Sequence, residues 1–278
     1  MSLTLYSPAK VNLFFKVLSK RKDGYHNIFS LYQTISLVDH FFIKKAKKDT
    51  FFCFNNKELK FDENNLIIKA LNLFRKETNI LDPIELYLKK NIPIEAGLGG
   101  GSSNAATTLF ALNEIFQKPL TLFQLIDISE KLGSDVPFFF SSGTALCEDK
   151  GNVFENVSSQ DLNFHIAKPN FGMSTKDVYE NVDLKLLEKS NETAIKNALL
   201  KKKEIKIFND LEVSAFHLNE KLKDTKIALE KMGFDKVVMT GSGSCFMCFG
   251  RIKPKSTKKI QVFSVFNIQR NLENWYSF

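Results

Sequence analysis

The sequence has no long hydrophobic run. No stretch of about 18 apolar residues occurs in its 278 residues, and a helix needs roughly that length to cross the hydrocarbon core of a bilayer. The N-terminus also lacks the charged segment, short apolar stretch and small-residue cleavage site of a secretory signal. We therefore expect no membrane partner and a cytoplasmic location.

Cysteine is scarce as well. The four cysteines, Cys53, Cys147, Cys245 and Cys248, are too few and too scattered for a disulfide framework in a chain of this length. Cys245 and Cys248 form a CxxC pair, but their segment has a strand pattern, in which positions three apart point to opposite faces. Neither a second pair nor a histidine cluster stands nearby, as a zinc site would require. We expect buried free thiols.

Acidic residues are outnumbered by basic ones. The chain has 39 Lys and Arg against 31 Asp and Glu, a formal net charge of +8 and a pI of about 9.1. This excess favours anionic partners such as nucleotides, nucleic acids or acidic surfaces without choosing among them. Lysine runs at 44–48 and 201–206 are more simply explained as solvated faces than as binding patches. With 44% hydrophobic residues, the chain can bury one large or two modest cores.

The first fifty residues have the patterning of β-strands. Residues 3–20 predict a strand, a turn marked by Pro8 and a second strand. A turn at Asp23-Gly24 follows, and strand patterning resumes over 31–46. The chain therefore starts with a sheet rather than with a helical domain.

Helices and strands alternate after this sheet. Apolar spacing predicts a helix over 65–77 and another over 105–116, and a third helix begins at the capping box formed by Thr121 and Gln124. Residues 136–148 have the composition of an apolar strand.

A second unit follows Gly151. It contains a strand, a short helix capped by Ser174, a lysine-rich helix, a further helix over about 215–232, and a strand-turn-strand around Gly241. We predict an α+β protein of two abutting domains, with a boundary near residue 150.

Four glycines, Gly97, Gly99, Gly100 and Gly101, stand directly before a helical pattern. Glycine lets a ligand approach the main chain and permits positive φ, so neighbouring amides can point together at an anion. The first turn of a helix adds unpaired amides and the positive end of its dipole. This arrangement favours a phosphate site over the alternative, a tight packing turn, which needs only one or two glycines. A Walker A loop would require Gly-Lys-Ser/Thr where this chain has Gly101-Ser102-Ser103, and the Rossmann fingerprint also fails.

Four motifs at matching positions resemble the GHMP small-molecule kinases. They are PIEAGLGGGSSNAA at 93–106, SPAKVNLFFKV at 7–17, GSDVPFF at 133–139 and TGSGSCFMCFG at 240–250. Two further segments, RKDGYHNIFSLYQTISLVD at 21–39 and NDLE at 209–212, are similar to one branch of that superfamily. That branch phosphorylates the 2-hydroxyl of 4-diphosphocytidyl-2-C-methyl-D-erythritol in the non-mevalonate route to isoprenoids.

The resemblance implies a two-domain GHMP kinase fold. Residues 1–150 would form the N-terminal β-α-β domain that binds ATP and carries the catalytic residues, and residues 151–278 the C-terminal α/β substrate domain. ATP would be the co-substrate, accompanied by Mg²⁺, and a small cytidine diphosphate sugar-alcohol would be the acceptor. The magnesium ligands are not assigned, because the acid that usually binds it has no clear counterpart here.

The resemblance also assigns catalytic roles. Asp135 matches the general base, and Lys10 would keep it ionised and polarise the accepting hydroxyl. On the residues alone, Asp135 is equally explained as a turn residue, and Lys10 as a surface lysine. The ATP-phosphate loop falls on Pro93, Ile94, Glu95, Ala96, Gly97, Leu98, Gly99, Gly100, Gly101, Ser102 and Ser103. One of Ser102, Ser103 and Asn104 would in any case serve as the helix N-cap.

Four residues are implied to bind the acceptor substrate. Asn12 lies two residues after Lys10 and so on the same face of a strand. Tyr25 would stack on the cytosine base, His26 would hydrogen-bond its edge, and Tyr179 matches the second stacking ring. On the residues alone, Tyr25 and His26 could simply cover a sheet edge, and Tyr179 could face the core.

Two other functions remain open at this point. The chain could be a GHMP kinase for mevalonate or homoserine, but neither substrate carries a base to occupy Tyr25 and Tyr179. It could also be a non-catalytic RNA-binding module. That function requires basic and aromatic residues interleaved on one strand face, whereas the aromatic residues here stand mostly in apolar runs. We therefore expect no nucleic-acid partner.

Overall fold

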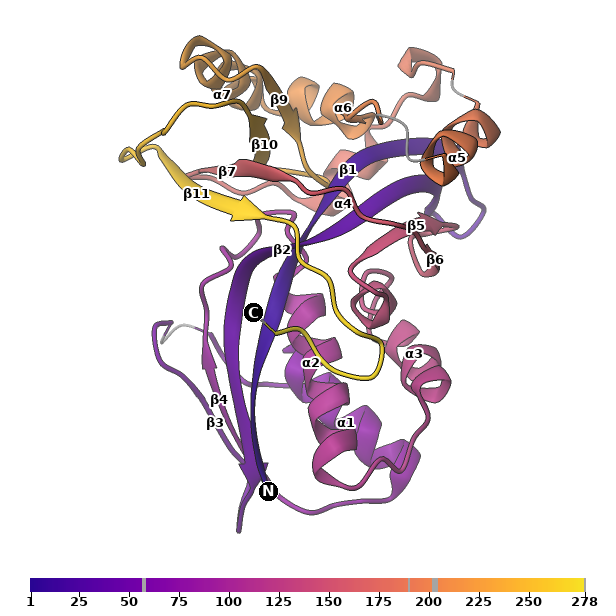
Figure 1. Cartoon of the computed structure of the whole chain (residues 1–278), viewed down its shortest axis with the longest axis vertical. Helices are drawn as coiled ribbons and strands as arrows, with labels where there is room; N and C mark the ends of the chain where they lie inside the picture. Colours follow the sequence, from indigo (N-terminus) through magenta and orange to yellow (C-terminus); the bar gives the residue numbers. More distant parts are fainter. Residues whose placement is uncertain (57–58, 190, 202–204, 278) are drawn as a thin grey trace.

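The computed structural model describes residues 1–56, 59–189, 191–201 and 205–277. Two layered α+β halves lie one above the other (Figure 1). The lower half contains a mixed sheet covered by helices, and the upper half contains a smaller antiparallel sheet. The predicted boundary near residue 150 stays a prediction. Two strands that follow it in the chain, β6 (Val153–Asn156) and β8 (Phe208–Asn209), pair with strands of the first sheet.

A long antiparallel hairpin connects the two halves. It consists of β1 (Ser2–Lys20) and β2 (His26–Lys45), joined by the predicted turn at Asp23-Gly24. The prediction of two strands separated by a turn at Pro8 was wrong, because β1 is continuous. Its pairing shifts register between Pro8 and Ala9, and a bulge is a place where a strand tolerates a residue without an N–H group.

The first sheet is completed around this hairpin. Its strand order is β3-β4-β2-β1-β8, and β5 pairs with β2 and β6. The additional strands are β3 (Thr50–Cys53), β4 (Ile84–Lys89) and β5 (Thr144–Glu148). The helices α1 (Leu66–Thr78), α2 (Gly100–Ile115) and α3 (Leu122–Glu130) lie beside it (Figure 1). Helix α3 has the predicted capping box.

The segment 136–148 differs from its prediction as a single strand. Pro137–Phe140 forms a short 3-10 helix, η1, and the strand begins only at Thr144. All three phenylalanines of η1 are buried, which a strand covered on one face only would not allow. The chain also leaves η1 through Gly143, whose φ of +101° is left-handed.

The second sheet has the strand order β11-β7-β10-β9 and is antiparallel throughout. Its strands are β7 (Asn163–Pro169), β9 (Lys236–Met239), β10 (Phe246–Phe249) and β11 (Ile260–Phe266). The associated helices are α4 (Thr175–Glu180), η2 (Leu184–Leu186), α5 (Glu192–Leu200), α6 (Leu211–Leu218) and α7 (Glu220–Lys231). The single helix predicted over 215–232 is two helices, because Asn219 is extended and its side chain caps α7.

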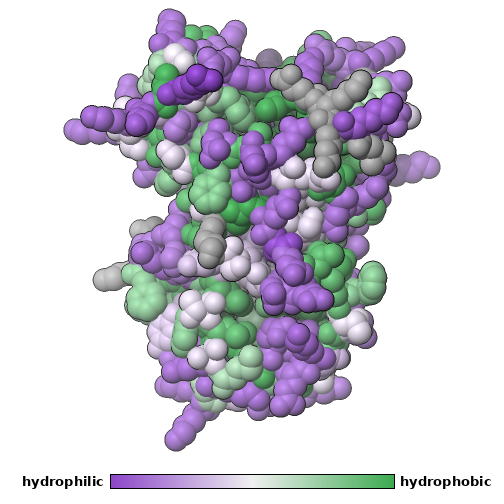
Figure 2. Space-filling view, viewed as in Figure 1, coloured by the Kyte–Doolittle hydropathy of each residue, from purple (hydrophilic) through white to green (hydrophobic). Residues whose placement is uncertain are grey.

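Several expectations from composition can be checked directly. All four cysteines are free and buried. Lys45, Lys47 and Lys48 of the first lysine run are exposed, whereas residues 202–204 of the second run lie outside the described residues. Figure 2 shows hydrophilic residues over much of one face, with smaller hydrophobic areas between them. Along the described ranges, no helix is both long and apolar enough to span a membrane.

Candidate active site

The glycine loop leads directly into α2. Gly97 and Gly99 have left-handed φ values of +73° and +66°, and Gly99 is the N-cap residue. No side chain of the described residues caps this helix, so the prediction of a cap at Ser102, Ser103 or Asn104 and of a start at 105 was wrong. The first helical hydrogen bond runs from Ser103 N to Gly99 O. The amides of residues 100–102 precede it and therefore lack acceptors within the helix, an arrangement that suits an anion.

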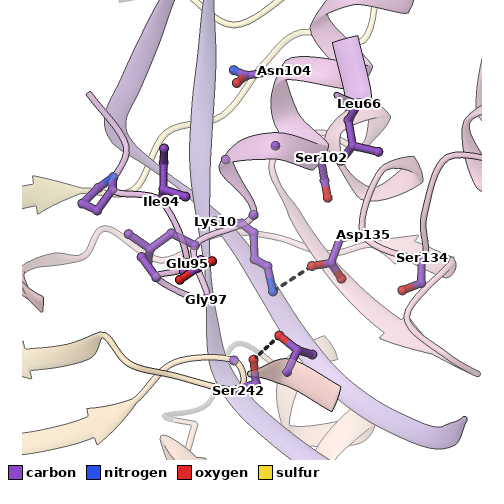
Figure 3. A pocket seen from close by; sticks show the side chains of 18 of the residues that line it. Lys10, Leu66, Ile94, Glu95, Gly97, Ser102, Asn104, Ser134, Asp135 and Ser242 are labelled. Atoms are coloured by element: carbon purple, nitrogen blue, oxygen red, sulfur yellow. Dashed lines mark hydrogen bonds and ion pairs between the residues drawn. The ribbon is translucent and has the colours of Figure 1, made fainter. Parts of the chain in front are cut away.

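A cavity of about 580 Å³ lies against this loop. Residues from both halves line it. They include Tyr179 as well as Lys10, Asp135 and Ser242, which are labelled in Figure 3. All the residues predicted to bind ATP line it except Ser103. Ser103 is buried and its Oγ accepts a hydrogen bond from Ser7 Oγ, so it joins α2 to β1.

Lys10 and Asp135 are brought together, as the resemblance implied. Lys10 Nζ lies 3.4 Å from Asp135 Oδ2 (Figure 3), and donates a hydrogen bond of 3.1 Å to Asn12 Oδ1. The lysine is only 4% exposed, which excludes the alternative of a surface lysine. The Asp135 side chain is 30% exposed, so a molecule in the cavity can reach the carboxylate.

Tyr32 is a site residue that the sequence did not reveal. Its hydroxyl donates to Asp135 Oδ1 at 3.1 Å, and Lys10 Nζ lies 4.4 Å from its ring centroid. Burial, followed by the nearby Asp135 charge, holds the pKa of Tyr32 well above its usual value, so the hydroxyl stays protonated. Each oxygen of the Asp135 carboxylate therefore has its own neighbour, Tyr32 or Lys10, and the group is held in one orientation.

The register of the hairpin explains why Tyr32 was missed. Tyr32 lies opposite Asn12, which places it beside the predicted catalytic residues. A regular hairpin extended from the Lys20–His26 pair would instead place Thr34 there. Two register shifts, at Asn12/Phe14 and Val17/Ser19, change the partner, and such bulges have no clear signal in this sequence.

A second cavity of about 450 Å³ adjoins the first. It contains Tyr25, His26 and Tyr179, and it shares four lining residues with the first cavity: Ser134, Lys150, Thr175 and Tyr179. Tyr25 is 58% exposed, and the Lys150 ammonium lies 5.7 Å from its ring centroid. The three predicted base-binding residues therefore surround one space that opens toward Lys10 and Asp135.

His26 is buried in the wall of this cavity. The ring centroids of His26 and Tyr179 are 5.4 Å apart, and Nδ1 of His26 is buried with no hydrogen-bond partner among the described residues. Burial, and to a lesser degree Lys20, lowers the pKa of His26, so the imidazole is neutral at pH 7. A buried ring nitrogen without a partner costs free energy unless a ligand supplies one.

The second glycine turn, 240–244, closes the site from the other half. A Cβ atom at Gly97 would lie 2.7 Å from Gly243 O, and one at Gly241 would lie 3.0 Å from Gly97 O. The backbone N–H of Asn12 donates to Thr240 Oγ1 at 2.9 Å. The two glycine segments therefore touch main chain to main chain, in agreement with the expected position of this turn.

Known proteins resemble this chain in sequence. The family model described as "GHMP kinases N terminal domain" matches residues 65–143. A 4-diphosphocytidyl-2-C-methyl-D-erythritol kinase of Protochlamydia amoebophila (strain UWE25) is 42% identical over 99% of this chain and 93% of its own length. The chloroplastic/chromoplastic enzyme of that name from Solanum lycopersicum is 38% identical over 99% of this chain and 73% of its own length.

A solved structure agrees with these relatives. The crystal structure of a 4-(cytidine 5'-diphospho)-2C-methyl-D-erythritol kinase superimposes with a TM-score of 0.79 at 27% identity, covering 95% of this chain and 99% of that one. The chain belongs to the 4-diphosphocytidyl-2-C-methyl-D-erythritol kinase family. The predicted GHMP kinase fold and α+β class are thereby confirmed, and ATP is the co-substrate that membership of a kinase family implies.

The contact between Gly99 and Lys10 leads to a first prediction. A Cβ atom at Gly99 would lie 2.9 Å from Lys10 Cγ and 3.3 Å from Phe139 Cζ. Gly99→Ala should displace Lys10 and lower kcat by about tenfold or more, since misplacing a catalytic group by about 1 Å can cost about a hundredfold. At Gly101 the nearest atom is Leu66 Cδ1 at 3.4 Å, an ordinary contact, so Gly101→Ala should act on the KM for ATP rather than on kcat.

Steady-state kinetics with varied ATP, on variants whose circular dichroism matches the wild type, would check this difference. A folded Gly99→Ala enzyme with wild-type kcat would show that Lys10 does not depend on this close approach.

Proposed function

We propose that the protein transfers the γ-phosphoryl group of ATP to the 2-hydroxyl of 4-diphosphocytidyl-2-C-methyl-D-erythritol, a step of the non-mevalonate route to isoprenoids. The observation that carries this proposal is the pair of connected cavities. One lies against a glycine-rich helix N-terminus and is also lined by Lys10 and Asp135. The other contains two aromatic rings and a histidine nitrogen that has no hydrogen-bond partner among the described residues, and the two cavities share Ser134, the neighbour of Asp135.

The first cavity suits ATP. The amides of residues 97–102 and the dipole of α2 can hold phosphate oxygens without a side-chain charge. Beyond them the cavity is lined by Leu59, Asn65, Leu66 and Ile94, a mixture of apolar and amide side chains that fits an adenine ring. The γ-phosphate would then lie at the cavity's junction with the second space.

Magnesium fits the oxygen donors at this end. Carboxylates of Glu95 and Asp135 and the hydroxyl of Ser102 line the cavity, while no group of three His, Cys, Asp or Glu side chains among the described residues could hold a metal. Mg²⁺ usually binds through one or two carboxylates plus the phosphates of the nucleotide. When bound with ATP it neutralises charge that develops on the transferring phosphoryl group.

Asp135 is the proposed general base. Phosphoryl transfer mainly requires alignment, charge neutralisation and one proton transfer. The carboxylate, oriented by Tyr32 and Lys10, accepts the proton of the substrate hydroxyl. The ammonium of Lys10 faces the same space, where it stabilises negative charge on the phosphoryl group. Asn12 holds Lys10 in this position.

The second cavity suits a pyrimidine. Tyr25 and Tyr179 provide stacking rings, and a neutral imidazole at His26 offers one N–H donor and one acceptor nitrogen. Mevalonate and homoserine carry no base and would leave Nδ1 of His26 unpaired. For this reason the cytidine substrate is the better match within the GHMP kinases. The cytoplasmic location and the lack of a nucleic-acid partner stay predictions.

One assay tests the proposed function. ATP consumption by the purified protein should occur with 4-diphosphocytidyl-2-C-methyl-D-erythritol and stay at background with mevalonate or homoserine. Turnover of mevalonate or homoserine at a comparable kcat/KM would reject the assignment.

A second prediction concerns the catalytic pair. Asp135→Asn keeps the size of the side chain but removes the proton acceptor, and should lower kcat by about a hundredfold or more while substrate binding survives. Lys10→Ala should have a comparable effect. The double variant should be little worse than the poorer single variant, because members of one catalytic unit are not additive. Fully additive losses in kcat would show that the two residues act independently.

A third prediction concerns the base. Tyr25→Ala and Tyr179→Ala should each cost about 1–3 kcal/mol of substrate binding, the usual value for stacking of a base on an aromatic ring. Tyr25→Phe and Tyr179→Phe serve as matched controls that keep the ring and should keep this affinity. His26→Ala should instead reduce discrimination between cytidine and uridine forms of the substrate, because it removes base-edge hydrogen bonds.

The measurement is kcat/KM for both nucleotide forms at saturating ATP, together with the KM for ATP. The stacking assignment fails if both alanine variants leave kcat/KM for the cytidine form unchanged, or if their loss appears equally in the KM for ATP.

A further inference from the structure

The NDLE segment, residues 209–212, has no role in the proposed chemistry. In the described part of the chain, none of its four residues lines either cavity of the active site. Its first residue, Asn209, is nevertheless buried, with 6% of its surface exposed. Both the nitrogen and the oxygen of its side-chain amide form hydrogen bonds. Nδ2 donates to Met239 O and to Gly241 O, both at 2.8 Å, and Oδ1 accepts from Leu211 N at 2.9 Å.

The other polar residues of the segment fix its position. Asp210 is anchored to β1 by its ion pair with Lys16 at 3.1 Å and by a hydrogen bond from Val17 N at 3.0 Å. Glu212 Oε1 accepts from Met239 N at 2.7 Å, and its other oxygen pairs with Lys226 at 2.8 Å. The segment thus ties β1 of the first sheet to the end of β9 in the second sheet.

The residues that Asn209 holds lead directly into the second glycine turn. Gly241 and Ser242 line the first cavity, and Ser242 is labelled in Figure 3. Gly241 approaches Gly97 so closely that a Cβ atom would lie 3.0 Å from Gly97 O. Thr240 accepts the N–H of Asn12, and Asn12 in turn contacts Lys10. A shift of this turn would therefore reach both the phosphate loop and the catalytic lysine.

We propose that Asn209 is a positioning residue for phosphoryl transfer. Its two N–H donors set the position of the 240–244 turn, which supports the glycine loop at Gly97 and the strand that carries Lys10. The amide is the side chain that suits this task, because it donates to two carbonyl groups while accepting from the first turn of α6. The inference rests on the proposed function, since phosphoryl transfer is the readout.

Two substitutions of Asn209 separate its hydrogen bonds. Asn209→Asp keeps the shape and the acceptor for Leu211 N, but turns a carboxylate oxygen toward two carbonyl oxygens. Asn209→Ala removes all three bonds. We expect each to lower kcat by about tenfold to a hundredfold, the scale on which a misplaced catalytic group acts, and to raise the KM for ATP more than that for the cytidine substrate.

Control variants distinguish positioning from a loss of stability. Lys226→Met breaks the ion pair with Glu212 without touching Met239 or Gly241 and should keep wild-type kcat. Leu229→Ala removes a fully buried side chain of α7 and should lower Tm, yet keep kcat at temperatures well below its own Tm. Gly241→Ala should resemble the Asn209 variants, and its combination with Asn209→Ala should be less than additive because the two act on one contact.

Wild-type turnover tests the proposed function, and the ratio of variant to wild-type kcat tests this inference. Wild-type kcat in a folded Asn209→Ala or Asn209→Asp enzyme would overturn it. The proposal would also be overturned if Leu229→Ala and an Asn209 variant had the same Tm and lost the same amount of kcat. If neither Asn209 variant folds, Gly241→Ala tests the same contact with Gly97, and unchanged kinetics in that variant would reject the proposal.

Discussion

The site depends on one main-chain contact, in which the two glycine turns meet with no side chain between them. A Cβ atom at Gly97 would lie 2.7 Å from Gly243 O and 2.9 Å from Thr240 O, distances that real Cβ atoms essentially never show. Because Thr240 and Gly243 follow β9 of the antiparallel sheet and Gly97 precedes α2 beside the first sheet, this contact holds the two halves together at the edge of the first cavity. Glycine is thus needed at these positions for two reasons. It adopts the left-handed φ, and it has no Cβ atom that would clash with the opposite main chain.

A buried carboxylate, that of Asp39, stabilises the glycine loop at 97–101. Asp39 is fully buried and accepts hydrogen bonds from Asn91 N, Ile92 N and Asn104 Nδ2, and it pairs with Lys90. Asn91 and Ile92 precede the glycine loop in the chain, just after β4. Asn104, in the second turn of α2, follows the loop. Breaking a buried charge pair costs about 3–5 kcal/mol, so the network resists movement of the loop. The glycine loop can therefore expose its backbone amides and still be held in place.

The sequence predicted the local chemistry of the site better than its geometry. Glycines before a helix indicated a phosphate site, and motif resemblance placed Lys10, Asp135 and His26, which the fold does bring toward one pair of cavities. Tyr32 could not be found, because its place opposite Asn12 depends on two bulges. The helix start was also missed, since the usual capping rule looks for a polar side chain whereas Gly99 caps α2 with its backbone alone.

One further error comes from contacts made by a distant part of the chain. The segment that was predicted as a strand forms the helix η1. The carbonyl groups at the end of η1 accept hydrogen bonds from the C-terminal segment. Arg270 donates to Phe140 O and Ser141 O, and Tyr276 donates to Phe139 O. No window around 136–148 contains these donors, so the local pattern of apolar residues had no reason to predict a turn.

The same contacts connect the C-terminal segment to Asp135, the proposed general base. Trp275 stacks on Phe110 of α2 with ring centroids 4.6 Å apart and donates to Tyr6 O, which fastens the segment to the first half (Figure 1). Asp135 lies two residues before the first residue of η1, and the rings of Phe138 and Tyr32 pack with their centroids 5.1 Å apart. The C-terminal segment thus fixes one end of the 135–141 segment, and Asp135 lies at the other end, so the position of Asp135 depends on contacts from distant parts of the fold.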